Sequence, residues 1–138
     1  MIEFKKTTDF PRGTLYNQLV DAYSFHADCQ KTWNTMWKEY EDFLFDNPMM
    51  AEKYSFVTVL DGEPVGHISW DPRHSPDYVE IGHNCILTKC KGKGLGHAQL
   101  AEAEWQNITY PAFFINGEND PFGTCQQLQE KVPSGKTF

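Results

Sequence analysis

The chain has 138 residues, of which 40% are hydrophobic and 14% aromatic, so it is too apolar to be disordered and long enough for one folded domain, residues 1–138. Its formal net charge of −7 argues against a general nucleic-acid-binding protein, which needs a basic surface to displace counterions from phosphates. No segment reaches the roughly 18 apolar residues of a membrane span, and the N-terminus lacks the apolar core of a signal peptide. We therefore expect a cytoplasmic protein with no nucleic-acid or membrane partner.

The first third of the chain predicts one strand and two helices. Alternating apolar and charged residues indicate a strand over residues 2–6, and helical spacing indicates a helix over residues 14–27. A second helix is expected from a cap at Thr32 to the stop signal Asn47-Pro48. Its aromatic stripe has two interpretations: core packing, which periodicity alone favours, or the lining of an acceptor pocket. The stripe consists of Trp33, Met36, Trp37, Tyr40, Phe43 and Leu44.

Three antiparallel strands are expected in the middle of the chain. The β-rich runs at residues 54–60 and 65–70 flank Asp61-Gly62-Glu63, which is a strong hairpin signal. A third apolar run starts at Tyr78. The three runs therefore predict an antiparallel meander.

A helix and a further strand should follow the meander. The helix is expected from about residue 94 to residue 105, and the next apolar run covers residues 112–115. Because a helical crossover usually returns beside its first strand, this run should lie parallel to the third strand of the meander. A last helix is expected over residues 121–131.

A lysine- and glycine-rich turn separates the third strand of the meander from the helix that begins near residue 94. Gly92, Gly94 and Gly96 allow successive backbone N–H groups to turn toward one point, and the helix adds the positive end of its dipole there. Such a turn binds an anion, most plausibly a phosphate. Lys89, Lys91 and Lys93 put three positively charged side chains beside this turn in a chain that is otherwise acidic.

The order of these elements, together with Lys91-Gly92-Lys93-Gly94-Leu95-Gly96, resembles the GNAT acetyltransferase superfamily. The hexapeptide is similar to that family's pyrophosphate loop, Q/R-x-x-G-x-G/A, with Lys91 in the place of Gln or Arg. The stretch DGEPVGHISW is similar to the family's second and third strands. The resemblance covers about residues 2–103. It implies an α/β (α+β) fold in which helices flank a mixed central sheet.

The resemblance also implies acetyl-CoA as the acyl donor and an amine of a small molecule or peptide as the acceptor. The pyrophosphate would lie on the loop, and the pantetheine arm would lie along the end of the preceding strand. The implied cofactor-binding residues are Cys85, Ile86, Leu87, Lys91, Gly92, Lys93, Gly94, Leu95 and Gly96.

Transfer to an amine requires a base, and Glu80 and His83 are the nearest candidates on the strand before the loop. Strict alternation would place Glu80 and His83 on opposite faces of that strand, and we favour Glu80 as the base with His83 second. Cys85, Cys90 and His97 lie close to His83 in sequence, but the spacing of the four matches no common zinc pattern, so no metal site is expected.

The resemblance fades beyond Glu104. Gln129 stands where the family usually has a tyrosine that acts as general acid, and the family's final strand pair is missing from the pattern. An unpaired sheet edge would favour a homodimer. These departures motivate an alternative hypothesis, a non-catalytic acyl-CoA-binding or regulatory module.

Overall fold

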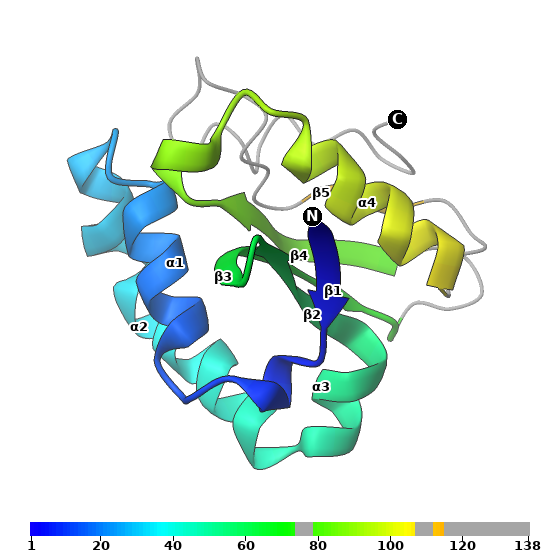
Figure 1. The fold of residues 1–138 in the computed structure, drawn as a ribbon. Coiled ribbons are helices and arrows are strands. Elements are labelled where there is room, and N and C mark those ends of the chain that lie inside the picture. Colours follow the sequence, from blue (N-terminus) through cyan, green and yellow to red (C-terminus); the bar gives the residue numbers. More distant parts are fainter. Residues whose placement is uncertain (74–78, 107–111, 115–138) are drawn as a thin grey trace.

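The structure is a computed structural model that describes residues 1–73, 79–106 and 112–114. Its five strands form one mixed sheet in the order β1-β2-β3-β4-β5 (Figure 1). The first four strands are antiparallel neighbours, and β5 lies parallel to β4. The predicted mixed sheet and parallel return are therefore confirmed. The strands are β1 (Ile2–Lys5), β2 (Ser55–Leu60), β3 (Glu63–Asp71), β4 (Val79–Ile86) and β5 (Ala112–Phe114).

Helices cover both faces of this sheet. On one face, Leu100 and Ala103 of α4 pack with Ile68, Trp70 and Ile81 of the sheet. On the other face lie α1 and α2, whose buried residues pack against β2 and β4. The helices are α1 (Thr14–Ala22), α2 (Ala27–Asp46), α3 (Pro48–Tyr54) and α4 (Leu95–Gln106), with short 3-10 turns at Thr7–Asp9 and Thr88–Cys90. In the described part of the chain, no helix is both long and apolar enough to span a membrane.

The structure places the break between the first two helices earlier in the chain than the sequence pattern predicts. α1 ends at Ala22, and α2 already begins at Ala27 instead of near Thr32. The Tyr23 N–H still bonds back to the Leu19 carbonyl, but His26 has an extended backbone, which ends the helical path. The polar residues at the start of α2 hid this early beginning from the hydrophobic pattern.

The sequence pattern does not predict the third helix, α3, because Asn47-Pro48 after a helix indicates a stop signal. Proline fits the first turn of a helix, where its missing N–H is not needed, and Pro48 occupies this position in α3. The helix packs its buried Ala51 against β2. It thereby closes one end of the space beneath α2, which matters for the site described below.

The β2–β3 hairpin has the geometry that its sequence predicts. Leu60 pairs with Glu63, so Asp61 and Gly62 form a two-residue loop. Both have positive φ, 51° and 86°, as such a loop requires. The predicted last helix, Gln129 and the question of the final strand pair lie outside the described residues.

Candidate functional site

A β-bulge in β4 determines which side chains face the α2 side of the sheet. Ser69 of β3 lies opposite His83, but the next residue, Trp70, lies opposite Ile81. Gly82 is therefore an extra residue in β4, and such an insertion breaks the alternation of side chains. Beyond it Glu80 pairs with Asp71, on the same face as His83.

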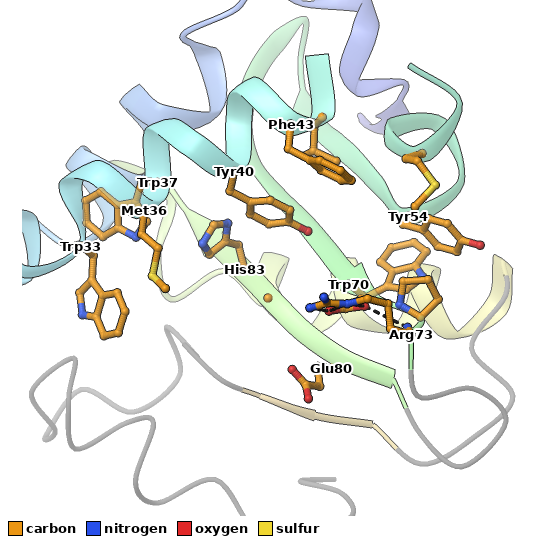
Figure 2. A pocket seen from close by; sticks show the side chains of 15 residues that line it. Trp33, Met36, Trp37, Tyr40, Phe43, Tyr54, Trp70, Arg73, Glu80 and His83 are labelled. Atoms are coloured by element: carbon orange, nitrogen blue, oxygen red, sulfur yellow. Dashed lines mark hydrogen bonds and ion pairs between the residues drawn. The ribbon is translucent and has the colours of Figure 1, made fainter. Parts of the chain in front are cut away.

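This bulge corrects the expectation that Glu80 and His83 lie on opposite faces. Both side chains line one cavity of about 520 Å³ beneath α2 and α3 (Figure 2). The sequence carried a signal for the bulge, because glycine inside a strand often marks one. A Cβ atom at Gly82 would lie 3.4 Å from the Tyr40 ring, which is an ordinary packing distance.

The cavity wall is mostly aromatic and apolar. Three hydrophobic side chains at its rim, Met36, Phe43 and Met50, are exposed by 56%, 45% and 37%. Trp37 and Leu44, in contrast, are fully buried, so the aromatic stripe of α2 serves both the core and the cavity. The cavity's aromatic side chains are Trp33, Trp37, Tyr40, Phe43, Tyr54 and Trp70.

Polar groups gather where β3 and β4 meet this cavity (Figure 2). Arg73 forms a bidentate pair with Asp71, with Nε and Nη2 lying 2.8 Å and 2.6 Å from Oδ2. The Arg73 guanidinium, although mostly exposed, therefore forms an ion pair with the Asp71 carboxylate. Glu80 lies half-buried in the same wall. Asp71, Arg73 and the Trp70 and Tyr54 rings were not predicted as site residues, because only the strand register brings them to Glu80.

The histidines on this face are held neutral by burial. Burial lowers the pKa of His83 to about 4, and it lowers the pKa of the neighbouring His67 well below its usual value. The His83 ring packs against Tyr40 with 5.0 Å between ring centroids. Burial also raises the pKa of Tyr40, so its hydroxyl keeps its proton at neutral pH. His83 can therefore accept a proton but does not carry one.

The predicted anion-binding turn has the required backbone form. Gly92 and Gly94 have φ of +83° and +81°, and a Cβ atom added at either would meet nothing within 4 Å. The Gly94 carbonyl accepts the Ala98 N–H, so α4 starts directly at this turn. The first N–H groups of a helix have no intrahelical partner, and they lie at the positive end of the helix dipole. The turn therefore fits a phosphate group.

The lysines of the turn differ in what they contact. Lys89 pairs with Glu63 at 2.5 Å, whereas Lys91 donates to the Ala22 carbonyl at the end of α1 and lies over the Phe25 ring. Lys93 is exposed beside the glycines. Lys91 thus connects the turn to α1. Lys93, in contrast, is exposed next to the turn and can interact with an anion bound there.

Buried amide side chains fix the turn and α4 to the sheet. Gln99 of α4 donates to Asn84 Oδ1 at 2.8 Å and to the His67 carbonyl at 3.0 Å. Asn84 in turn donates to the Gly96 carbonyl at 3.4 Å. Gly66 leaves room for Gln99, because a Cβ atom there would lie 2.9 Å from Gln99 Oε1 and 2.3 Å from the Cys85 carbonyl oxygen.

Among the described residues, no strand pairs with the outer edge of β4 between Ile81 and the turn. In the described part of β5, pairing with β4 is limited to Val79–Ile81. Leu87 donates its N–H to Val65 of β3, so by alternation the backbone groups of Asn84 and Ile86 point toward the opposite edge. Ile86 and Leu87 were both predicted to contact the pantetheine arm. The backbone groups of Ile86 point toward this edge, whereas the Leu87 N–H is hydrogen-bonded to β3.

The predicted residues thus fall into two groups that the open edge of β4 connects. Glu80 and His83 lie at the cavity, whereas Gly92 and Gly94 lie at the turn beyond the end of the strand and Gly96 lies in the first turn of α4. The Cys85 side chain belongs to neither, because it is fully buried with its Sγ 3.3 Å from His67 Nδ1. Among the described residues, no cluster of three His, Cys, Asp or Glu side chains could hold a metal ion.

Comparison with known proteins relates the chain to one family. The model of the acetyltransferase (GNAT) family matches residues 15–106. No curated protein sequence matches the chain.

Solved structures share the fold at low sequence identity. The PaiA N-acetyltransferase of Thermoplasma acidophilum, in complex with coenzyme A, is 12% identical with a TM-score of 0.63, and the match covers 88% of this chain and 82% of that one. A GNAT acetyltransferase of Brucella melitensis, in complex with acetyl-CoA, is 15% identical with a TM-score of 0.54 over 85% and 77% of the two chains. Diaminobutyrate acetyltransferase EctA of Paenibacillus lautus is 13% identical with a TM-score of 0.51 over 83% and 64%.

Proposed function

This chain belongs to the acetyltransferase (GNAT) family, and on that premise we propose that it is an N-acetyltransferase acting on a primary amine. The acetyl group would come from acetyl-CoA and pass directly to an amine of a small molecule or peptide. One observation carries the proposal: the Gly82 bulge brings Glu80 and His83 together on a cavity that the open edge of β4 connects to an anion-binding turn. Structural relatives crystallised with coenzyme A or acetyl-CoA support the choice of donor.

The residues that would hold acetyl-CoA follow from the open groups of the site. The turn of Gly92 and Gly94, with Gly96 at the start of α4, would take the pyrophosphate, and the exposed Lys93 between the two glycines would add positive charge. The backbone groups of Asn84 and Ile86 would pair with the pantetheine amides as an added strand would. When bound, the donor supplies a thioester carbonyl that an amine can attack.

The protein's own part is to position the amine and to remove its proton. Holding the amine close to the acyl carbon supplies much of the rate of a direct transfer. We assign the proton to the Glu80 carboxylate, either directly or through a water molecule. His83 is the second candidate. Its pKa of about 4 leaves it neutral and weakly basic at neutral pH.

Calorimetric titration with acetyl-CoA tests the donor site. Wild-type protein should bind, and Gly94→Leu should lose at least about tenfold in affinity, because a side chain would fill the space in front of the backbone N–H groups. Gly13→Leu is the matched control: Gly13 also has positive φ, +107°, and open space around it, but it lies at the start of α1. Equal affinity of both variants would contradict the placement of the donor.

A non-catalytic acyl-CoA-binding module would bind acetyl-CoA without turnover. Release of free CoA across a panel of amines separates that alternative from an enzyme. The proposed homodimer is tested by light scattering of the purified chain, where the mass of a monomer would exclude it. The single-domain organisation and the cytoplasmic location remain predictions.

A further inference from the structure

We propose that the C-terminal end of α1 positions the glycine turn for acetyl-CoA, with Asp21 and Lys91 as the positioning residues. This inference rests on the proposed function and adds that Lys91 acts through the turn instead of binding the pyrophosphate. The end of α1 lies beside the segment that leads from β4 into α4 (Figure 1). Hydrogen bonds between these two parts of the chain carry the inference.

The end of α1 has carbonyl groups that need partners, because the last carbonyls of a helix have none within the helix. The Thr88 hydroxyl donates to the Asp21 carbonyl at 2.9 Å, and the Lys91 ammonium donates to the Ala22 carbonyl at 2.5 Å. The Asp21 side chain adds a third bond, since its Oδ1 accepts the Thr88 N–H at 2.9 Å. Three hydrogen bonds therefore join residues 88–91 to the end of α1.

The Lys91 ammonium already has favourable surroundings at α1. It lies at the negative end of the α1 dipole, where a cation is stabilised, and 5.0 Å from the centroid of the Phe25 ring. A move to a phosphate on the turn would break these contacts and take the ammonium away from the Ala22 carbonyl. Lys93, in contrast, is exposed beside the glycines. We therefore assign the charge that faces the phosphate to Lys93 and the positioning to Lys91.

The end of α1 is firmly packed, so it can serve as an anchor. Ala22 is fully buried, and Tyr23 is exposed by only 2%. The Tyr23 ring stacks on Trp37 of α2, with 5.7 Å between centroids and 26° between planes. The same buried cluster includes Cys85 of β4. The anchor is therefore fixed relative to β4, along which the pantetheine arm would lie.

The turn itself needs an anchor on each side. Gly92 and Gly94 allow its backbone form, but glycine also loses the most conformational freedom when it becomes ordered. After the turn, α4 is fixed to the sheet by Gln99. Before the turn, the bonds to α1 have this role. A turn that is already ordered binds its ligand at a lower entropic cost, so loss of the α1 bonds should weaken acetyl-CoA binding.

Calorimetric titration of Asp21 variants with acetyl-CoA tests the inference, because charge and positioning predict opposite signs. Asp21→Ala removes a negative charge near the turn, which by electrostatics alone should strengthen the binding of an anion. Positioning predicts instead that the affinity falls about threefold or more, the effect of one lost hydrogen bond. Asp21→Asn removes the same charge but keeps an acceptor, and should bind nearly as well as the wild type. An affinity of Asp21→Ala that equals or exceeds that of Asp21→Asn would overturn the inference.

Controls separate positioning from a general loss of structure. Asp28→Ala removes an exposed acidic side chain from the nearby start of α2 and should not weaken binding. Thermal unfolding establishes that each variant is folded at the temperature of the titration. If Asp21→Ala does not fold, Thr88 decides, because Thr88→Val removes only the hydroxyl donor and Thr88→Ser keeps it. Equal affinities of these two variants would then overturn the inference.

Ionic strength separates Lys91 from Lys93. Lys93→Met removes an exposed charge, so its loss of affinity should largely disappear at high salt. Lys91→Met should lose affinity by a similar factor at low and high salt, because it breaks a partly buried hydrogen bond to α1. A loss in Lys91→Met that disappears at high salt would indicate a phosphate contact and contradict the inference.

The same titrations distinguish failure of the inference from failure of the proposed function. If the Asp21 and Lys91 variants behave as described but no amine of a panel is acetylated, the catalytic function fails and the positioning stands. If amines are acetylated while both Asp21→Ala and Lys91→Met bind acetyl-CoA as tightly as the wild type, the inference fails and the function stands. If the wild type does not bind acetyl-CoA, both are wrong.

Discussion

At the scale of single residues, Glu80 and His83 occupy one cavity but differ in their suitability as a base. We predict that Glu80→Gln lowers kcat by about 100-fold or more, because it removes the proton acceptor and keeps the shape of the side chain. The affinity for acetyl-CoA should not change, since Glu80 lies away from the glycine turn. His83→Gln is the comparison, and a larger loss of kcat in that variant would transfer the role of base to His83.

Gly66 is predicted to be essential for stability and not for chemistry. A Cβ atom at this position would lie 2.3 Å from a backbone oxygen and 2.9 Å from Gln99 Oε1, neither of which can move freely. Gly66→Ala should therefore destabilise the fold by about 1–3 kcal/mol, as overpacking of a close-packed core does. Urea unfolding monitored by tryptophan fluorescence measures this loss, and an unchanged midpoint would contradict the packing described for α4.

The sequence analysis names Glu80 and His83 as alternative candidates for the base on one strand, but it places them on opposite faces. Alternation along a regular strand separates them, and only the register between β3 and β4 shows that Gly82 is an extra residue. Asp71 and Arg73 were missed for the same reason, since nothing local relates them to Glu80. Partners across a sheet depend on register, which the hydrophobic pattern of one strand does not determine.

At the scale of elements, the glycine turn and the hairpin could be predicted because their conformations are local. Positive φ at Gly62, Gly92 and Gly94 follows from residue type, and so does the two-residue loop at Asp61. The break between α1 and α2 and the short helix α3 could not be predicted equally well. Their limits depend on packing beneath the sheet, as the burial of Ala51 shows.

The lysines beside the turn give a prediction at this scale. Lys93→Gln should weaken acetyl-CoA binding about two- to fivefold, the effect of one exposed charge, and should do so less at high salt. Lys89→Gln should have a smaller effect, because Lys89 is paired with Glu63. Titrations of both variants at two ionic strengths provide the measurement. A larger loss for Lys89→Gln would mean that the anion lies on the other side of the turn.

At the scale of the whole molecule, buried neutral histidines make the fold sensitive to acid. Burial lowers the pKa of both His67 and His83, the latter from 6.5 to about 4. The unfolded chain therefore binds protons below about pH 6.5 that folded His83 accepts only near pH 4. Stability should fall as the pH drops through this window, by up to about 1.4 kcal/mol per pH unit for each such group.

Thermal unfolding at pH values across this window measures the effect. His83→Gln should show a shallower loss of stability than the wild type, since one of the two buried histidines is gone. His97→Gln is the control, because His97 is exposed on α4. Identical pH dependence in the wild type and His83→Gln would show that His83 can be protonated within the folded protein.

The most direct measurement is the mass of the product formed when the protein is mixed with acetyl-CoA and a panel of primary amines. We predict an N-acetylated amine and one equivalent of free CoA for each molecule of product. The Gly94→Leu and Glu80→Gln variants should form it far more slowly, and Gly13→Leu should form it at nearly the wild-type rate. Product formation at the wild-type rate in both Gly94→Leu and Glu80→Gln would contradict a single site that extends from the glycine turn to the cavity.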